Sequence, residues 1–157
     1  MNMQQVTNLR TRLSNQSIAD HGIQKALTDM CDMIAKTADT RFTIAVCDRL
    51  GDLTDETCLN IYRIAHEAVT NALRHGKATH IHLSLQRQDH QCILDIINNG
   101  IPMSGPLRYG LGLKLIQQRA ELLNAAFFLE PTQQQKTRFR CIIPLQAVPS
   151  MHAAPMP

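Results

Sequence analysis

Apolar residues recur along this chain with the two periods that distinguish helices from strands. Three segments space them by three and four residues, as on one side of an amphipathic helix. Five shorter segments alternate apolar and polar residues, as a half-buried strand does. The pattern predicts helices over residues 23–37, 54–75 and 109–123, and strands over residues 41–47, 80–85, 92–97, 126–130 and 137–145.

Residues that typically begin and end helices support these boundaries. Asp20 is placed to cap the first helix and Thr54 the second. Asp55 and Glu56 put negative charge in the first turn of the second helix, where the helix dipole favours it. Gly76 is expected to end that helix. The third helix has five apolar positions, namely Leu113, Ile116, Ala120, Leu122 and Leu123.

The order of these elements predicts the fold class and the extent of the domain. It indicates an α/β fold, a two-layer sandwich with helices on one face of a mixed β-sheet. We expect the domain to cover residues 20–146. Residues 1–19 carry only a thin apolar stripe and are predicted to be a helical lead-in, the remnant of an upstream dimerisation region. Residues 147–157 are small and proline-containing, and we expect them to be disordered.

Composition excludes several classes of protein. The chain has 157 residues, of which 44% are hydrophobic and 18% charged, as in an ordinary globular domain. The net charge of +3 is slight and no basic run occurs, which argues against a nucleic-acid surface. No stretch has the length of a membrane span, and the N-terminus lacks an apolar signal core. Five cysteines, odd in number and widely spaced, argue against a disulfide framework or a zinc site. We therefore expect a cytoplasmic chain that contacts neither nucleic acid nor membrane.

The second helix carries an unusual polar face. Glu67 and Asn71 are four residues apart, so their side chains emerge side by side. A carboxylate and an amide oxygen next to each other suit a hard cation such as Mg²⁺, or a polarised water. A solvated helix face explains the same residues, so this segment alone leaves both interpretations open.

Two glycine-containing motifs follow. Asn98, Asn99 and Gly100 stand where a strand gives way to a loop, a usual place for ligands, although Asn and Gly are also common in turns. Gly110 and Gly112 stand at the start of the third helix, whose free N–H groups point toward any anion placed there. The loop between the motifs, rich in proline and glycine, would be able to cover a ligand, and an idle surface loop explains it as well.

Together these segments resemble the GHKL ATPases, a superfamily that includes histidine kinases, gyrase-type ATPases and anti-sigma kinases. I-Y-R-I-A-H-E-A-V-T-N-A-L-R-H-G-K-A is similar to the N box of short-lid sensor histidine kinases of the nitrate- and sugar-phosphate-sensor type. G-L-G-L-K-L-I-Q-Q-R-A-E-L-L-N-A is similar to the glycine box and following helix of the same branch. The resemblance spans roughly residues 20–146 and implies a Bergerat-type ATP-binding fold with ATP and Mg²⁺ as cofactors.

The resemblance also implies roles for individual residues. Glu67 would act as general base, or orient the water or nucleophile near the γ-phosphate, and Asn71 would coordinate Mg²⁺. Arg74 and His75 would lie near the phosphates or the lid. Gly100 would let the chain pass close to adenine. The backbone of three consecutive residues would cradle phosphate: Gly110, Leu111 and Gly112.

The chain departs from the family pattern at the adenine end. Asn98 stands where the family has the aspartate that binds the adenine amino group. Its amide oxygen still accepts that hydrogen bond but lacks the charge, a difference of about 1–2 kcal/mol, or roughly tenfold in affinity. Pro102 replaces the family's second glycine in this motif, and Lys136 replaces the glycine before the last strand. These departures indicate a weakened adenine site.

Three functions are consistent with the sequence. The first is the catalytic domain of a sensor histidine kinase, which donates the ATP γ-phosphate to a histidine on a helical hairpin outside this chain and so acts indirectly on a response regulator. This domain would be the cytoplasmic portion of a membrane sensor or a detached module, with a dimer expected through its N-terminal helix. The second is a degenerate module with weak or no ATP binding that serves docking or regulation. The third is an anti-sigma-type serine kinase, because E-A-V-T-N-A also suits that branch.

Overall fold

The computed structural model describes residues 22–51, 53–101 and 111–145. A first helix covers residues 22–38. The remaining elements are β1 (Arg41–Val46), α2 (Asp55–Gly76), β2 (His80–Gln88), β3 (Gln91–Asn98), α3 (Leu111–Leu122), β4 (Ala126–Pro131) and β5 (Thr137–Pro144). Each predicted helix and strand is present, with ends that move by a few residues.

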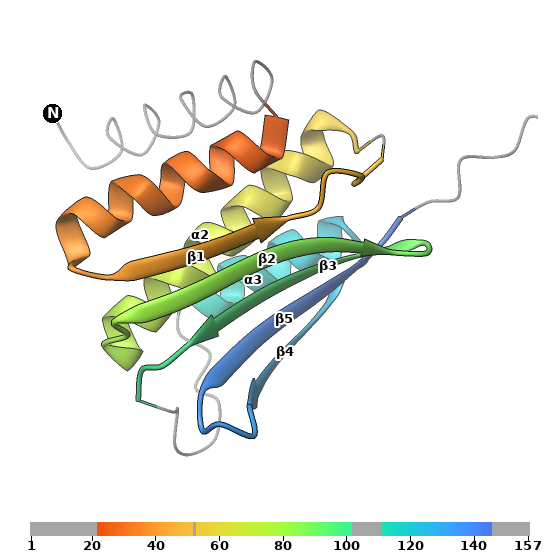
Figure 1. The fold of residues 1–157 in the computed structure, drawn as a ribbon. Helices are drawn as coiled ribbons and strands as arrows, with labels where there is room; N and C mark the ends of the chain where they lie inside the picture. Colours follow the sequence, from red (N-terminus) through yellow and green to blue (C-terminus); the bar gives the residue numbers. More distant parts are fainter. Residues whose placement is uncertain (1–21, 52, 102–110, 146–157) are drawn as a thin grey trace, which may run out of the picture.

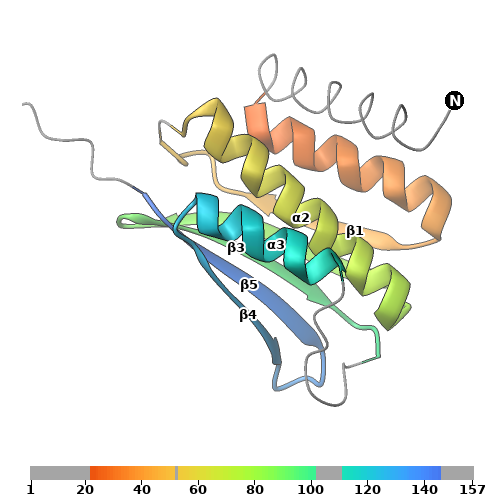
Figure 2. The same ribbon diagram turned by 180° about the vertical axis from the view of Figure 1, so that it is seen from behind.

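The strands form one five-stranded sheet with the order β1-β2-β3-β5-β4. β1 and β2 are parallel, and all other neighbours are antiparallel, so the sheet is mixed as predicted. The helices lie on one face of this sheet, and the opposite face is open (Figures 1 and 2). The predicted two-layer α/β sandwich is therefore confirmed.

The hydrophobic core lies between the helices and the sheet. Leu83 on β2 lies opposite Ile96 on β3, which in turn lies opposite Phe139 on β5, and all three are buried. Above them, Ile61 and Ile64 of α2 are fully buried. Burying a side chain of this size stabilises the fold by about 1.5–3 kcal/mol. This core fixes the face that α2 turns toward the sheet.

Both the start and the end of α2 follow the prediction. The Thr54 side chain accepts a hydrogen bond from the Thr57 backbone N–H at 3.1 Å, which confirms Thr54 as the N-cap. At the other end, Gly76 lies within the last turn, and Lys77 takes the left-handed conformation with φ 51°. The helix therefore ends at Gly76 as expected, and the residue after the glycine takes the left-handed conformation.

One apolar position of α3 was assigned incorrectly. Leu113, Ile116 and Ala120 are buried, whereas Leu122 is 66% exposed. Leu122 follows Ala120 by two residues, which turns its side chain about 200° around the helix and away from the core. Leu123, just beyond the helix, packs against the core instead.

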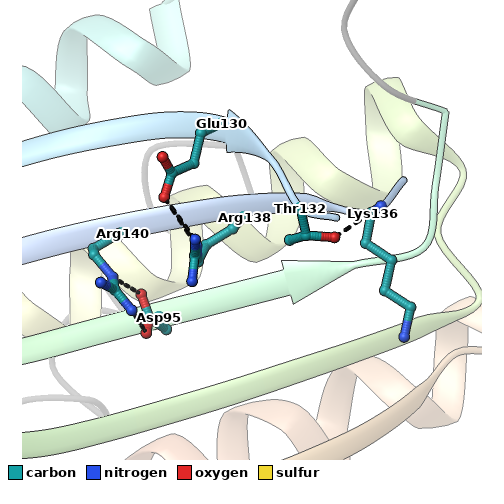
Figure 3. A network of polar contacts seen from close by, with 6 residues as sticks. All are labelled: Asp95, Glu130, Thr132, Lys136, Arg138 and Arg140. Carbon is teal, nitrogen blue, oxygen red and sulfur yellow. Dashed lines mark hydrogen bonds and ion pairs between the residues drawn. The ribbon is translucent and has the colours of Figure 1, made fainter. Parts of the chain in front are cut away.

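Two ion pairs cross the open face of the sheet. Arg140 on β5 donates two hydrogen bonds to Asp95 on β3, at 2.7 and 2.8 Å, and Arg138 pairs with Glu130 on β4 at 2.9 Å (Figure 3). The Arg140–Asp95 pair is bidentate, the strongest geometry for an arginine and a carboxylate. These pairs link three neighbouring strands on the face that no helix covers.

The cysteines are small interior side chains, as predicted. Cys31, Cys58, Cys92 and Cys141 are buried, and Cys47 is half-buried. Burial raises the pKa of Cys31, Cys92 and Cys141 to about 12. These thiols therefore remain protonated at neutral pH.

Among the helices that the structure describes, none has the length and apolar character needed to cross a membrane. Several predictions lie outside the described residues. They concern Asp20 as a cap, the lead-in over residues 1–19, the tail over residues 147–157, Pro102 and Gly110.

Candidate functional site

Four predicted site residues lie on the C-terminal half of α2. Glu67 and Asn71 are half-buried and one turn apart, while Arg74 and His75 are exposed in the last turn. The apolar stripe of α2 faces the sheet, so these polar residues lie along its other sides. The helix dipole favours positive charge in the last turn, and the Arg74 guanidinium fills this structural role in any case.

The start of α3 contacts the side chain of Asn71. A β-carbon built on Gly112 would lie 2.7 Å from Asn71 Oδ1 and 3.1 Å from Nδ2. Only a glycine allows the backbone to approach the amide this closely. The structure thus joins two predicted site residues, Asn71 and Gly112, which are 41 residues apart in the sequence. The preceding Gly110 lies outside the described residues, and Leu111 is the first residue of α3.

The end of β3 forms a second close contact with α2. The Asn98 side chain is 8% exposed, and its Oδ1 accepts a hydrogen bond from the Gly100 N–H at 2.9 Å. The next N–H, that of Ile101, donates to the Gly76 carbonyl at 2.7 Å. A β-carbon on Gly100 would overlap the Gly76 carbonyl oxygen and would lie 2.7 Å from its carbon. The glycine at position 100 therefore lets the strand end meet the helix end backbone to backbone.

Asn99 has a structural role. Its Oδ1 accepts hydrogen bonds from the backbone N–H groups of Thr79 and His80, at 3.0 and 2.9 Å. Its Nδ2 donates to Thr79 Oγ1 at 3.0 Å. Of the two amides in the N-N-G motif, Asn99 is thus occupied in fixing the loop before β2, and Asn98 is the one at the buried strand end.

Sequence reasoning missed Thr137 as a site residue. It is the first residue of β5, lies opposite Asn98 in the sheet, and is 9% exposed. The same face of β5 continues with Phe139, Cys141 and Ile143, all buried. A single hydroxyl at the end of an otherwise apolar alternation is the signal that would have identified it. Asn98 and Thr137 form a small polar end to the core, beside the end of α2.

A polar contact between α2 and α3 was also missed. Asn60 is 4% exposed, and its Nδ2 donates to the Glu56 carbonyl at 3.1 Å. Its Oδ1 accepts a hydrogen bond from Arg119 Nη1 of α3 at 3.4 Å. Burial lowers the pKa of the half-buried Arg63, and the neighbouring Arg119 guanidinium lowers it further. Although Asn60 is polar, α3 covers it at this point of α2.

A groove of about 600 Å³ lies between α3 and the edge strand β4. Its lining is mostly apolar and includes Leu113, Ala120, Phe127 and Leu129. None of the predicted site residues lines it, so the groove is separate from the contacts around Asn71 and Asn98.

The described site therefore has two parts along the same half of α2. One part is Asn71 with Gly112, and Glu67 lies one turn before it. The other is Asn98 with Gly100 at the end of α2, about one and a half turns beyond Asn71. A carboxylate, an amide and a helix start at one part suit a cation and phosphates. The other part is a buried strand end, where Asn98 and Gly100 meet the end of α2.

Comparison with known proteins agrees with this arrangement. Residues 57–147 match the model of the histidine kinase-, DNA gyrase B- and HSP90-like ATPase family. The chain is 31% identical over 85 residues to the sensor histidine kinase YxjM of Bacillus subtilis, a match covering 54% of this chain and 21% of that protein. It is 24% identical over 143 residues to the oxygen sensor histidine kinase NreB of Staphylococcus carnosus, covering 89% of this chain and 41% of that protein. The chain thus spans less than half the length of these curated relatives.

Solved structures share the fold. The blue-light activated histidine kinase of Erythrobacter litoralis EL346 superposes with a TM-score of 0.66 at 21% identity, covering 78% of this chain and 42% of the other. The ATP binding domain of PrrB from Mycobacterium tuberculosis gives a TM-score of 0.60 at 21% identity and covers 80% of this chain and 95% of the other. The resemblance to GHKL ATPases inferred from the sequence is confirmed. The chain belongs to the family of histidine kinase-, DNA gyrase B- and HSP90-like ATPases, with the fold of histidine-kinase ATP-binding domains.

Proposed function

We propose that this chain is the Mg²⁺-ATP-binding catalytic domain of a sensor histidine kinase. In this proposal it donates the γ-phosphate to a histidine on a helical hairpin outside this chain, in the parent sensor or another polypeptide. The observation that carries the proposal is the contact between Gly112 at the start of α3 and the Asn71 side chain, with Glu67 one turn earlier on α2. In support of the proposal, the Asn71 amide lies against the start of α3, and the Glu67 carboxylate is on the same helix one turn before it.

The residues present fit Mg²⁺-ATP. The Asn71 amide oxygen is a hard ligand suited to Mg²⁺, and the free N–H groups at the start of α3 suit phosphate oxygens. Bound Mg²⁺ would neutralise charge on the phosphates, as phosphoryl transfer requires. Glu67 would hold or accept the proton of the attacking group, while Arg74 and His75 would approach the phosphates from the exposed end of α2. Phosphate contacts are proposed for Gly110 and Leu111 as well as Gly112.

At the adenine end, Asn98 would accept the hydrogen bond from the adenine amino group. Its Oδ1 already accepts one bond, from Gly100, and a carbonyl oxygen has a second lone pair for another. Thr137 would add a hydroxyl beside it, and Gly100 would let the chain pass close to the ring. The amide is uncharged, so we propose modest nucleotide affinity.

Calorimetric titration with a non-hydrolysable ATP analogue tests the proposal. Wild-type protein should bind the analogue in the presence of Mg²⁺. The variant Asn71→Ala should lose most of the gain in nucleotide affinity that Mg²⁺ gives to wild type. Glu67→Gln should still bind but hydrolyse ATP more slowly. Gln117→Ala, an exposed change on α3, is the matched control and should bind as wild type does. A folded sample that gives no heat at millimolar nucleotide would rule the proposal out.

A degenerate docking module is the second candidate, favoured by the departures at Asn98, Pro102 and Lys136. The substitution Asn98→Asp separates the two. In an active but weakened site it should raise nucleotide affinity about tenfold, because a charged acceptor strengthens the adenine contact. In a degenerate module it should create no binding. The curated relatives compared above are sensor histidine kinases, which supports histidine rather than serine as the acceptor.

Further parts of the proposal concern the chain's surroundings. The proposed partners are the nucleotide, the phosphoacceptor hairpin and, through it, a response regulator. We propose that residues 20–146 form the catalytic domain, that residues 1–19 continue toward a dimerisation region, and that the chain works in the cytoplasm. Mixing this chain with an isolated acceptor hairpin and radiolabelled ATP would test whether the hairpin is a partner. Acid-labile label on the hairpin would identify phosphohistidine.

A further inference from the structure

The contact between Asn60 and Arg119 is a polar feature that the proposed chemistry leaves unused. It joins the first half of α2 to the second half of α3, through a hydrogen bond of 3.4 Å from Arg119 Nη1 to Asn60 Oδ1. Asn60 is 4% exposed and has its Nδ2 bonded to the Glu56 carbonyl. The amide is therefore held in one orientation by its own helix, with its oxygen presented to α3.

A second arginine close to this contact opposes its formation. Arg63 lies on the same side of α2, and its positive charge opposes that of Arg119. Among the ion pairs between described residues, none involves either arginine. Two guanidinium groups are thus kept near each other, with the amide oxygen as the acceptor for one of them. Buried amides without a partner are destabilising, which explains why Asn60 and Arg119 depend on each other.

The contact lies at one end of α3, and the proposed Mg²⁺ ligand lies at the other. Gly112 contacts Asn71, and Arg119 contacts Asn60, so α3 runs antiparallel to α2. Seven residues separate Gly112 from Arg119, about 10 Å along the helix axis. The apolar contacts of α3 made by Leu113, Ile116 and Ala120 are non-directional and permit small rotations and shifts. The directional hydrogen bond between Arg119 and Asn60, at the C-terminal end of α3, fixes the rotation and shift of this helix.

We propose that Asn60 and Arg119 are positioning residues of the nucleotide site, which set the rotation and height of α3 on α2 so that the Gly112 backbone rests against the Asn71 amide. The inference rests on the proposed function for its effect on nucleotide binding, while the positioning itself is a property of the free protein. The two residues touch neither Asn71 nor the nucleotide and act through α3. A purely stabilising contact would leave the Asn71 environment unchanged when removed, and the proposal requires that it change.

A double-mutant cycle on Mg²⁺-dependent nucleotide affinity tests the proposal. Asn60→Ala and Arg119→Met should each weaken binding of the Mg²⁺-nucleotide analogue about five- to tenfold, and the double variant should be no worse than the more affected single variant. Arg119→Lys retains a donor and should recover most of the affinity. Gln117→Ala, on the same helix, should bind as wild type does. Additive losses, or no loss at all, would overturn the proposal.

Arg63→Met distinguishes geometry from charge. If Arg119 acted through its charge on the nucleotide, removing the neighbouring charge of Arg63 would weaken binding to a similar degree. Positioning through Asn60 predicts instead that Arg63→Met keeps affinity within about twofold of wild type, since it leaves the hydrogen bond intact and removes a repulsion. A loss equal to that of Arg119→Met would overturn the proposal.

A nucleotide-free measurement keeps the inference separate from the proposed function. In nitrogen–proton correlation spectra, the Asn71 side-chain amide can be assigned by its absence in Asn71→Asp. Asn60→Ala and Arg119→Met should shift this resonance and the Gly112 amide, and Gln117→Ala should shift neither. If wild type binds no nucleotide but these shifts occur, the proposed function fails and the positioning stands. If both resonances stay in place in folded variants, the positioning is wrong whatever the nucleotide result.

Discussion

Gly112→Ala is predicted to separate nucleotide binding from stability. The added β-carbon would lie 2.7 Å from Asn71 Oδ1 and 3.3 Å from Cγ, whereas ordinary non-bonded contacts begin at about 3.5 Å. Either the Asn71 amide or the start of α3 must therefore move by roughly 0.5–1 Å. The obstructing atoms belong to the end of a side chain, so a change of rotamer relieves the overlap at small cost.

The expected effect on stability is slight. Alanine within a helix is more favourable than glycine by about 1 kcal/mol, which offsets part of the strain at Asn71. We expect the free energy of unfolding to change by less than about 1 kcal/mol in urea titrations. The proposed Mg²⁺ ligand would be displaced, however, and Mg²⁺ tolerates little deviation from octahedral geometry at about 2.1 Å. Disturbing the support of a metal ligand typically costs 10–100-fold in affinity, so binding of the Mg²⁺-nucleotide analogue should fall by about that factor.

Calorimetry of nucleotide binding and urea unfolding of the same samples provide the assay, with Gln117→Ala as the control on the same helix. If Gly112→Ala binds the Mg²⁺-nucleotide analogue as tightly as wild type, the reasoning is refuted, because nucleotide affinity would then not depend on the position of the Asn71 amide. A variant that loses several kcal/mol of stability would refute it differently, by showing that the α3 backbone and not the side chain must yield.

The remaining predictions concern stability and thiol reactivity. Gly100→Ala should lower the free energy of unfolding by about 2 kcal/mol or more, because its β-carbon meets the Gly76 backbone, which cannot rotate away; an unchanged urea midpoint would contradict this. Asp95→Asn breaks a bidentate ion pair whose carboxylate is 15% exposed, and it should lower the free energy of unfolding by about 1–3 kcal/mol. Asp29→Asn, in the exposed pair with Lys25, should lower it by under about 0.5 kcal/mol. Equal losses of stability for the two variants in thermal or urea unfolding would refute the argument from burial. Burial raises the pKa of Cys31, Cys92 and Cys141 from 9.0 to about 12, so the unfolded chain releases these protons at lower pH than the folded protein does. The free energy of unfolding should therefore fall by up to about 1.4 kcal/mol per pH unit per thiol as the pH rises from about 9 to about 12. A double variant with two of these cysteines replaced by alanine should show a shallower fall. At pH 8, Cys47 should be alkylated before the buried cysteines when modified peptides are followed by mass spectrometry.

The site was predictable from the sequence to the extent that it consists of local motifs. Glu67 and Asn71 share a helix, so their spacing alone places them one turn apart. Asn98, Gly100 and Gly112 stood out as local motifs, and the resemblance to GHKL ATPases proposed a role for each of them. Thr137 was missed because the local pattern marks only an unusual hydroxyl, while its position opposite Asn98 depends on the pairing of β3 with β5.

Other features depend on the tertiary structure in the same way. Gly76 ends α2 as expected, but no local pattern shows that its carbonyl accepts a hydrogen bond from the N–H of Ile101 in a distant loop. Asn60 is a polar residue of α2 that α3 covers. Leu122 looked buried because it is apolar, although its angular position on α3 turns it outward.

The sequence by itself determined the helices and strands, their caps and their apolar faces, because those depend on neighbours within one or two turns and on the alternation of burial along each element. The tertiary structure decided which faces meet: Gly112 against Asn71, Gly100 against Gly76, and Arg119 against Asn60. Each of these contacts joins elements far apart in the chain, and its geometry depends on how the whole core packs. Close packing leaves no slack at such points, so single glycines and one buried amide set the spacing that the proposed chemistry needs.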